Sequence, residues 1–212
     1  MRFVQFSDVH LDSSIGGAMN LPADKRSTLR QDLRTALARA CGLATEHKAD
    51  LVLIPGDLFD HETVRPDTAS FIADLLRSIA PIPVFIAPGN HDSLRPGSPY
   101  APVQDIAWPD NAHIFRSATF ETVPMDDLDC TVTGLGHAHR GVTDRLLAAQ
   151  IQRERKPINL LLFHGSRDGY KPSEKETVIP FSDGELLAQG FTYAAVGHYH
   201  SLSRITESGA GV

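Results

Sequence analysis

The stretch LVLIPGDLFD, residues 51–60, decides the fold class of this chain. Its first four residues are an unbroken apolar run, which is typical of a strand covered on both faces of a sheet. The run stops at Pro55 and Gly56, and the carboxylate of Asp57 follows directly. A buried strand that ends in a polar turn is typical of α/β folds, whose sites form at the carboxyl ends of strands.

The same pattern returns along the chain, where short apolar strands alternate with longer segments of helical period. We expect further strands at 3–6, 83–86, 113–115, 119–123, 130–133, 159–163 and 192–196. Helices are expected at 22–48, from Pro66 to about residue 79, and at 143–155. This alternation predicts an α/β fold with helices packed outside a sheet or a pair of sheets. The length predicts one domain over residues 1–212.

The composition excludes several classes of protein. A hydrophobic share of 42 % is too high for disorder, and Cys41 and Cys130 are too few for a disulfide scaffold. No apolar run approaches the length of a membrane span, and Met1 leads at once into the first strand rather than a secretory signal. We therefore expect no membrane association and a reduced, cytoplasmic setting. The net charge of −6 argues against a strongly electrostatic nucleic-acid binder, although a deep metal site can supply positive charge locally.

Polar clusters follow five of the expected strands. In chain order they are D-V-H at 8–10, G-D-L-F-D at 56–60, G-N-H-D at 89–92, H-G at 164–165 and G-H-Y-H at 197–200. The carboxyl ends of strands in an α/β fold can meet at one edge, so the sequence predicts a single site. The glycines before Asp57, Asn90 and His198 would let the backbone turn tightly away from each strand.

The donor types in these clusters point to metal ions. Carboxylates, imidazoles and an amide, without thiolates, suit divalent Mn, Fe or Zn. The candidate ligands are Asp8, His10, Asp57, Asn90, His164, His198 and His200. Seven ligands are too many for one ion, and two ions sharing one carboxylate account for them. The alternative is a set of polar turn and capping residues, which rarely falls into five ordered blocks.

Together the five blocks resemble the signature of the calcineurin-like metallophosphoesterases over nearly the whole chain. The resemblance implies a four-layer α/β/β/α sandwich, with two mixed sheets flanked by helices. It also implies that Asp8, His10, Asp57 and His200 hold one metal, and that Asp57, Asn90, His164 and His198 hold the other. We take Mn²⁺ as the expected metal, with Fe or Zn as alternatives. His91 would protonate the leaving oxygen, and Asp92 would orient His91 and raise its pKa.

Within that superfamily the chain is most similar to bacterial DNA-repair exonucleases of the Mre11/SbcD type, including the YhaO-like branch. The supporting residues are F-S-D-V-H-L-D at 6–12, G-D-L-F-D at 56–60 and Arg65-Pro66-Asp67. Asp60 stands where archaeal and eukaryotic members often have His, and His61 follows it; whether His61 contacts phosphate is open. The resemblance implies a DNA exonuclease in which a metal-bridging hydroxide attacks phosphorus.

Two rival functions remain open at this point. A small-molecule phosphodiesterase of the cyclic-nucleotide type would share the five blocks, and a non-cutting scaffold for a partner ATPase would belong to another class. A protein Ser/Thr phosphatase is less favoured, because those enzymes place Arg where this chain has Pro88.

Several other residues lie near the motifs. We expect His137 and His139 to occupy a loop or groove near the site without ligating metal, and Tyr199 to pack away from its neighbours. Arg140 and Arg167 are expected to be solvated, and His47 and His113 to lie at the surface or an edge. Packing is expected for Tyr100 and Trp108 rather than stacking on a base.

Only twelve residues follow His200, so we expect the domain to be incomplete at its C-terminus. The resemblance implies that a further region would grip DNA, support a homodimer and bind an SbcC/Rad50-like ATPase. The acidic domain alone should hold DNA weakly.

Overall fold

The protein is described here from a computed structural model, which covers residues 1–11, 13, 21–60, 64–100, 106–154, 156–170, 176–200, 203 and 205. His61 and residues 206–212 lie outside these described residues, so the questions raised about them are not addressed by the structure. Within the described part of the chain, no helix is both long enough and apolar enough to cross a bilayer.

Eight strands form two four-stranded sheets in the described chain. The first sheet has the order β1 (Phe3–Gln5), β2 (Leu51–Ile54), β3 (Val84–Ile86) and β4 (Ala112–Ile114). The second has the order β5 (Glu121–Met125), β6 (Cys130–Gly134), β7 (Ile158–His164) and β8 (Tyr193–Gly197). Every predicted strand is confirmed to within two residues.

The two sheets differ in strand direction. The second sheet is mixed, because β5 and β6 are antiparallel while the other pairs are parallel. The resemblance predicts that the first sheet is mixed as well, but all its described pairs are parallel. Long crossovers join all three pairs, as parallel neighbours require, and those between β1 and β2 and between β2 and β3 contain a helix.

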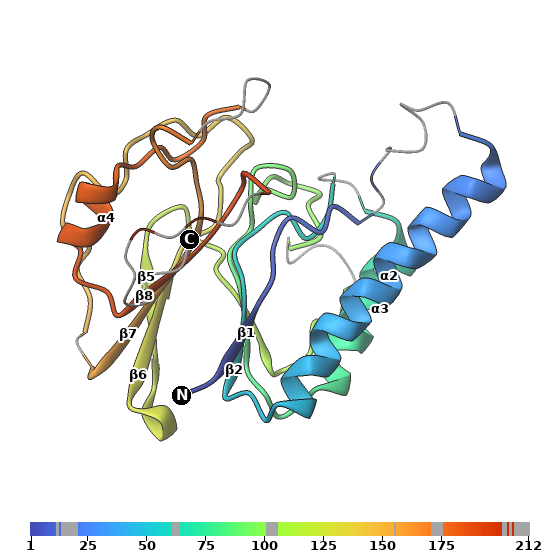
Figure 1. Ribbon diagram of the computed structural model, residues 1–212, viewed down its shortest axis with the longest axis horizontal. Helices are drawn as coiled ribbons and strands as arrows, with labels where there is room; N and C mark the ends of the chain where they lie inside the picture. The colour runs from blue at the N-terminus through green and yellow to red at the C-terminus, as the bar shows by residue number, and fades with distance from the viewer. Residues whose placement is uncertain are drawn as a thin grey trace.

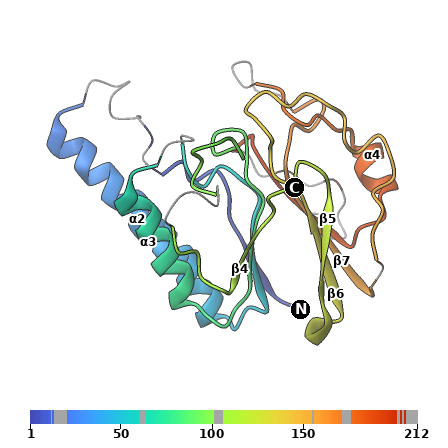
Figure 2. The same cartoon turned by 180° about the vertical axis from the view of Figure 1, so that it is seen from behind.

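The helices lie outside the two sheets and complete four layers (Figures 1 and 2). The long helix α2 (Ala23–Glu46) and α3 (Pro66–Ser78) cover the outer face of the first sheet. The short helix α4 (Asp183–Ala188) lies outside the second sheet, and a 3₁₀ turn, η1 (Asp126–Leu128), joins β5 to β6. The expected α/β/β/α sandwich is therefore observed.

Alternate residues of the central strands face different apolar layers. On β2, Val52 and Ile54 pack toward the helices, while Leu51 and Leu53 pack in the layer between the sheets. All four side chains are fully buried. This two-sided burial explains the unbroken apolar run from which the fold class was predicted.

The helix predicted at 143–155 is wrong, because the described part of that stretch consists of turns, bends and chain without regular secondary structure. Its apolar residues do pack into the core, but the buried amide of Gln189 bonds to its backbone. The Gln189 Nε2 donates to the carbonyls of Leu147 and Ala149, and its Oε1 accepts from the Ile151 N–H. Backbone groups that a helix would have paired internally are therefore satisfied by a distant side chain.

Strands β1, β2 and β3 of the first sheet and β7 and β8 of the second end at one edge of the sandwich, the upper edge in Figure 1. The ends of these five strands and the loops that leave them carry all the predicted ligands. The fold thus brings residues 8 and 200 into one place.

Candidate metal centre

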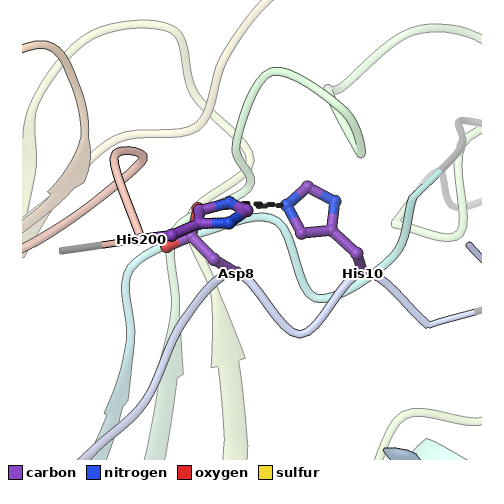
Figure 3. A group of neighbouring side chains, drawn as sticks. All are labelled: Asp8, His10 and His200. Carbon is purple, nitrogen blue, oxygen red and sulfur yellow. Dashed lines mark hydrogen bonds and ion pairs between the residues drawn. The ribbon is translucent and has the colours of Figure 1, made fainter. Parts of the chain in front are cut away.

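The first cluster at this edge consists of Asp8, His10 and His200, from the loops after β1 and β8 (Figure 3). The Nε2 atoms of His10 and His200 lie 3.2 Å apart, and His200 Nε2 lies 3.3 Å from Asp8 Oδ1. Two imidazole nitrogens and a buried carboxylate oxygen that converge in this way suit a divalent cation.

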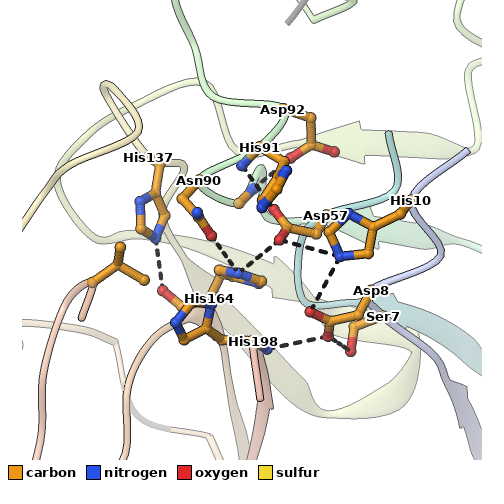
Figure 4. A network of polar contacts seen from close by, with 12 residues as sticks. Ser7, Asp8, His10, Asp57, Asn90, His91, Asp92, His137, His164 and His198 are labelled. Carbon is orange, nitrogen blue, oxygen red and sulfur yellow. Dashed lines mark hydrogen bonds and ion pairs between the residues drawn. The ribbon is translucent and has the colours of Figure 1, made fainter. Parts of the chain in front are cut away.

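The second cluster consists of Asp57, His164 and His198, all of them buried (Figure 4). His164 Nε2 lies 3.2 Å from Asp57 Oδ2 and 3.0 Å from Asn90 Oδ1. Asp57 Oδ2 also lies 3.7 Å from His10 Nε2, in the first cluster. Asp57 is thus positioned between the two clusters, where a shared ligand would have to be.

Backbone carbonyls fix the tautomers of the two buried imidazoles. His164 Nδ1 donates to the Pro55 carbonyl at 2.9 Å, and His198 Nε2 donates to the Glu176 carbonyl at 2.8 Å. Each bond leaves the other ring nitrogen unprotonated when the ring is neutral, as a metal ligand must be.

The charges of the centre also fit cation binding. Burial raises the pKa of Asp8, but the nearby His200 ring and the charge of His164 outweigh it and lower the pKa to about 2. Burial likewise opposes ionisation of Asp57, and His164 more than compensates, so this pKa is also lowered. Burial lowers the pKa of His164, but the opposite effect of Asp57 is larger and raises this pKa to about 9. Both carboxylates are therefore ionised at neutral pH, as metal ligation requires.

Asp60 is a candidate functional residue to which the motif pattern assigns no role. Its Oδ1 accepts from His10 Nδ1 at 3.0 Å and lies 3.4 Å from His91 Nδ1. The Asp60 carbonyl lies 3.2 Å from the same His91 nitrogen. The hydrogen bond to Asp60 raises the pKa of His91, and burial opposes this effect. One carboxylate therefore orients both a candidate ligand and the candidate acid; its only signal in the sequence is the G-D-x-x-D spacing.

The orienting role expected for Asp92 is corrected by the structure. Asp92 is fully buried, and its carboxylate accepts from the N–H groups of Leu58, Phe59 and Gly89 and from the Tyr100 hydroxyl. Those four donors occupy the carboxylate, and within the described residues no hydrogen bond joins it to the His91 ring. Burial and the charge of Asp57 raise the pKa of Asp92 to about 6. Asp92 instead ties the loop after β2 to the loop after β3.

Backbone strain is concentrated at the candidate ligands. The φ angles of Asp8, His10, Asp57 and His200 lie between 49° and 55°, and that of His198 is 129°. Residues other than glycine rarely adopt a positive φ, and those that do cluster at functional sites. These turns aim successive side chains at one point after each strand ends.

Two of the three motif glycines do not have the turn conformation that the sequence predicts. Gly56 does have a positive φ, of 88°, but Gly89 and Gly197 do not. A Cβ on Gly89 would lie 2.2 Å from Asp57 Oδ1, and a Cβ on Gly197 would lie 2.1 Å from the Pro55 carbonyl oxygen. At these two positions glycine permits close packing against the centre rather than a special turn.

The remaining residues near the motifs have mixed outcomes. His137 is buried beside His164, and His139 is exposed. Burial and the charge of His164 lower the pKa of His137 to about 3, so His137 is neutral. Tyr199 does not pack away from its neighbours, because its ring lies 4.7 Å from that of His198.

Three further expectations concern side chains outside the clusters. Arg167 is buried and bonded to Asp183, so its predicted exposure is wrong, whereas Arg140 is exposed as predicted. Tyr100 and Trp108 stack on each other in the core, which confirms packing for both.

Known proteins share this fold and sequence pattern. The chain matches the calcineurin-like phosphoesterase family over residues 1–202, and it therefore belongs to that family. It is 26 % identical over 206 residues to the uncharacterized metallophosphoesterase YhaO of Bacillus subtilis, a match that covers 94 % of this chain and 48 % of that protein. It is also 26 % identical over 212 residues to the DNA double-strand break repair protein Mre11 of Thermoplasma acidophilum, covering 94 % and 51 %.

A third relative, the DNA double-strand break repair protein Mre11 of Nanoarchaeum equitans, is 25 % identical over 216 residues, with 92 % of this chain and 56 % of that protein covered. The chain thus spans about half the length of these relatives. Among solved structures, TT1561 of Thermus thermophilus superposes with a TM-score of 0.53 at 14 % identity, covering 98 % of this chain and 86 % of that one. That likeness supports the fold alone.

Proposed function

We propose that this chain hydrolyses phosphodiester bonds with two divalent cations, and that its substrate is DNA, which it degrades from an end. The observation that carries the proposal is the position of Asp57 between two clusters of carboxylate and imidazole groups. Mn²⁺ is the metal we propose first, because nitrogen and oxygen donors without thiolate suit it.

The ligands divide between the two ions around the shared carboxylate. Asp8, His10 and His200, with Asp57, would hold one cation; Asn90, His164 and His198, with Asp57, would hold the other. When bound, the two cations would neutralise phosphoryl oxygens and lower the pKa of a water molecule at the centre. The chain contributes by holding the donors in place before any ion arrives, through the Pro55, Glu176 and Asp60 contacts.

His91 is the proton donor in this proposal. Its ring packs edge-on against that of His10 at 4.7 Å and remains partly exposed, so it borders the centre and can be reached by substrate. Donation from Nδ1 to the Asp60 carbonyl directs the Nε2 edge away from Asp60. Because its pKa is raised, the ring holds its proton to a higher pH than an ordinary imidazole, and Nε2 can deliver that proton to the leaving sugar oxygen.

The choice of DNA rests on the similarity to two Mre11 proteins whose names state a role in double-strand break repair. The net charge of −6 predicts weak binding of DNA by this chain alone, since few basic groups can replace counterions. An ATPase partner and self-association belong to the same proposal. The buried free thiols Cys41 and Cys130 favour a cytoplasmic setting.

The test compares four substrates with the purified, Mn²⁺-loaded chain: a bis-aryl phosphate, end-labelled duplex DNA, single-stranded DNA and cyclic AMP. We expect hydrolysis of the aryl diester and release of nucleotides from duplex ends. Exclusive hydrolysis of cyclic AMP would support the small-molecule alternative, and no hydrolysis of any substrate would support the scaffold.

The role of His91 is tested with His91→Ala and, as a matched control, His139→Ala at an exposed position. His91→Ala should bind metal normally but lose hydrolysis by about 10²–10⁴-fold, the usual contribution of a general acid. Full activity in that variant would refute the acid role.

A further inference from the structure

His137 lies at the junction of three loops, and neither the motif pattern nor the proposed mechanism uses it. Its side chain is fully buried, and Nε2 donates to the carbonyl of His164 at 2.7 Å (Figure 4). Its backbone N–H donates to the Pro88 carbonyl at 3.0 Å, and its own carbonyl accepts from the Leu94 N–H at 2.8 Å. His137, in the loop after β6, is thus bonded to Pro88 and Leu94 in the loop after β3 and to the last residue of β7.

Those contacts concern one half of the metal centre. The loop between Pro88 and Leu94 carries Asn90, and β7 ends in His164. The Asn90 Oδ1 and His164 Nε2 atoms lie 3.0 Å apart, and the His137 and His164 rings meet edge-on with centroids 5.6 Å apart. The ligands of the other half, Asp8, His10 and His200, come from the loops after β1 and β8, which His137 does not bond within the described residues.

We propose that His137 is a positioning residue that sets the Asn90–His164 half of the dimetal centre and leaves the Asp8–His10–His200 half unaffected. This inference rests on the proposed two-metal function. It predicts that a change at His137 weakens one metal site selectively, whereas loss of a purely structural residue would weaken both sites together.

The ring nitrogens of His137 permit a clean substitution. Its Nδ1 atom makes no hydrogen bond within the described chain, so His137→Phe keeps an aromatic ring at this position and removes one hydrogen bond, that from Nε2 to His164. His137→Gln is the rescuing variant, because a glutamine amide can place a donor near the Nε2 position. His139→Phe is the control, since His139 is two residues away and exposed.

The experiment is a titration of the metal-free chain with Mn²⁺ by calorimetry, together with the electron paramagnetic resonance spectrum at each ratio. The wild type and His139→Phe should bind two equivalents and show the spectrum of a coupled pair. His137→Phe should bind one equivalent with unchanged affinity and the second about 10–100-fold more weakly, with a mononuclear spectrum until the second ion binds. His137→Gln should recover most of the second affinity.

Each failure has a separate meaning. If the wild type binds fewer than two ions, the proposed function fails. If the wild type binds two ions and His137→Phe binds both normally, or loses both equally, only the role of His137 is overturned. Should His137→Phe not fold, His137→Asn replaces it: its shorter amide cannot reach the Nε2 position, so Asn should lose the second ion where Gln keeps it. Equal binding by Asn and Gln would contradict the inference.

Discussion

The two halves of the metal centre differ sharply in their exposure to solvent. In the inner half, Asp57 is 1 % exposed and the His164 side chain is 0 % exposed. In the outer half, the exposed fractions are 8 % for Asp8, 12 % for His10 and 45 % for His200. The inner ligands are thus part of the packing between the sheets, whereas the outer ligands line the rim. From this difference we predict that the fold depends more on the inner half and that substrate approaches the outer half.

The largest effect is expected where the two halves meet. Asp57→Asn removes the charge of the only carboxylate that lies between the clusters in the described chain. Several kcal/mol of charge stabilisation depend on the ions, so hydrolysis should fall by about 10³-fold or more. The measurement is the rate on a bis-aryl phosphate beside the bound metal content. Asp74→Asn, at an exposed position of α3, should leave both unchanged.

Stability should separate the two halves directly. In chelator, His164→Ala leaves Asp57 buried without its main cationic partner, which should lower the free energy of unfolding by about 3–5 kcal/mol. His200→Ala removes a half-exposed group and should cost less than about 1 kcal/mol. Urea denaturation measures both. Equal losses would show that exposure does not distinguish the halves.

The dependence of stability on alkaline pH should also come from the inner half. The pKa of His164 is raised from 6.5 to about 9 in the metal-free fold, chiefly by Asp57 against the effect of burial. A raised pKa stabilises the fold fully below the unfolded value and loses that contribution as the pH rises through the folded value.

Unfolding free energy in chelator should therefore decrease between about pH 6.5 and pH 9 by roughly 2–3 kcal/mol. His164→Ala should flatten that slope, and His200→Ala should retain it. Saturating Mn²⁺ should also remove it, because metal ligation displaces the proton. If the slope persists in His164→Ala, another titrating group causes it.

The smallest effect is expected at Asp60, on the outer side. Asp60→Asn keeps the size of the side chain but removes the charge that raises the pKa of His91. Because the acid must be protonated, the alkaline limb of the activity profile should move to lower pH, with a rate loss of about tenfold at neutral pH. An unmoved limb would separate Asp60 from the proton donor.

The strands and the candidate ligands could be predicted from the sequence, since each depends on a local pattern. The apolar run of β2 can be recognised in the sequence because both faces of the strand are buried. The candidate ligands can be recognised because they lie at or just after the ends of strands. The partners of those ligands could not be predicted, because they depend on directions that the chain takes after each strand. The Asp60 side chain contacts His10, which is 50 positions away in the chain. Asp92 accepts from Leu58 and Phe59 in the loop after β2, and from Gly89 and Tyr100 in its own loop.

The helix assignments show the same limit. The period at 143–155 is genuine, but Gln189 competes for its backbone groups. The short helix α4 is absent from the sequence-based expectations although it carries a signal: Ser182 and Glu185 form a capping box. That signal is weak in the sequence because only a turn and a half of helix follows it.

The left-handed backbone at five of the candidate ligands has a consequence for mutagenesis. Alanine at positive φ retains a steric cost of about 1–2 kcal/mol, whereas glycine carries essentially none. An alanine scan of positions 8, 10, 57, 198 and 200 would therefore combine two effects, the missing ligand and the surviving strain. Paired alanine and glycine variants separate the two effects, because both lack the ligand but only alanine keeps the strain. We expect the glycine variant to unfold at a higher temperature than its alanine counterpart. The difference measures how much the backbone conformation at each ligand position destabilises the fold.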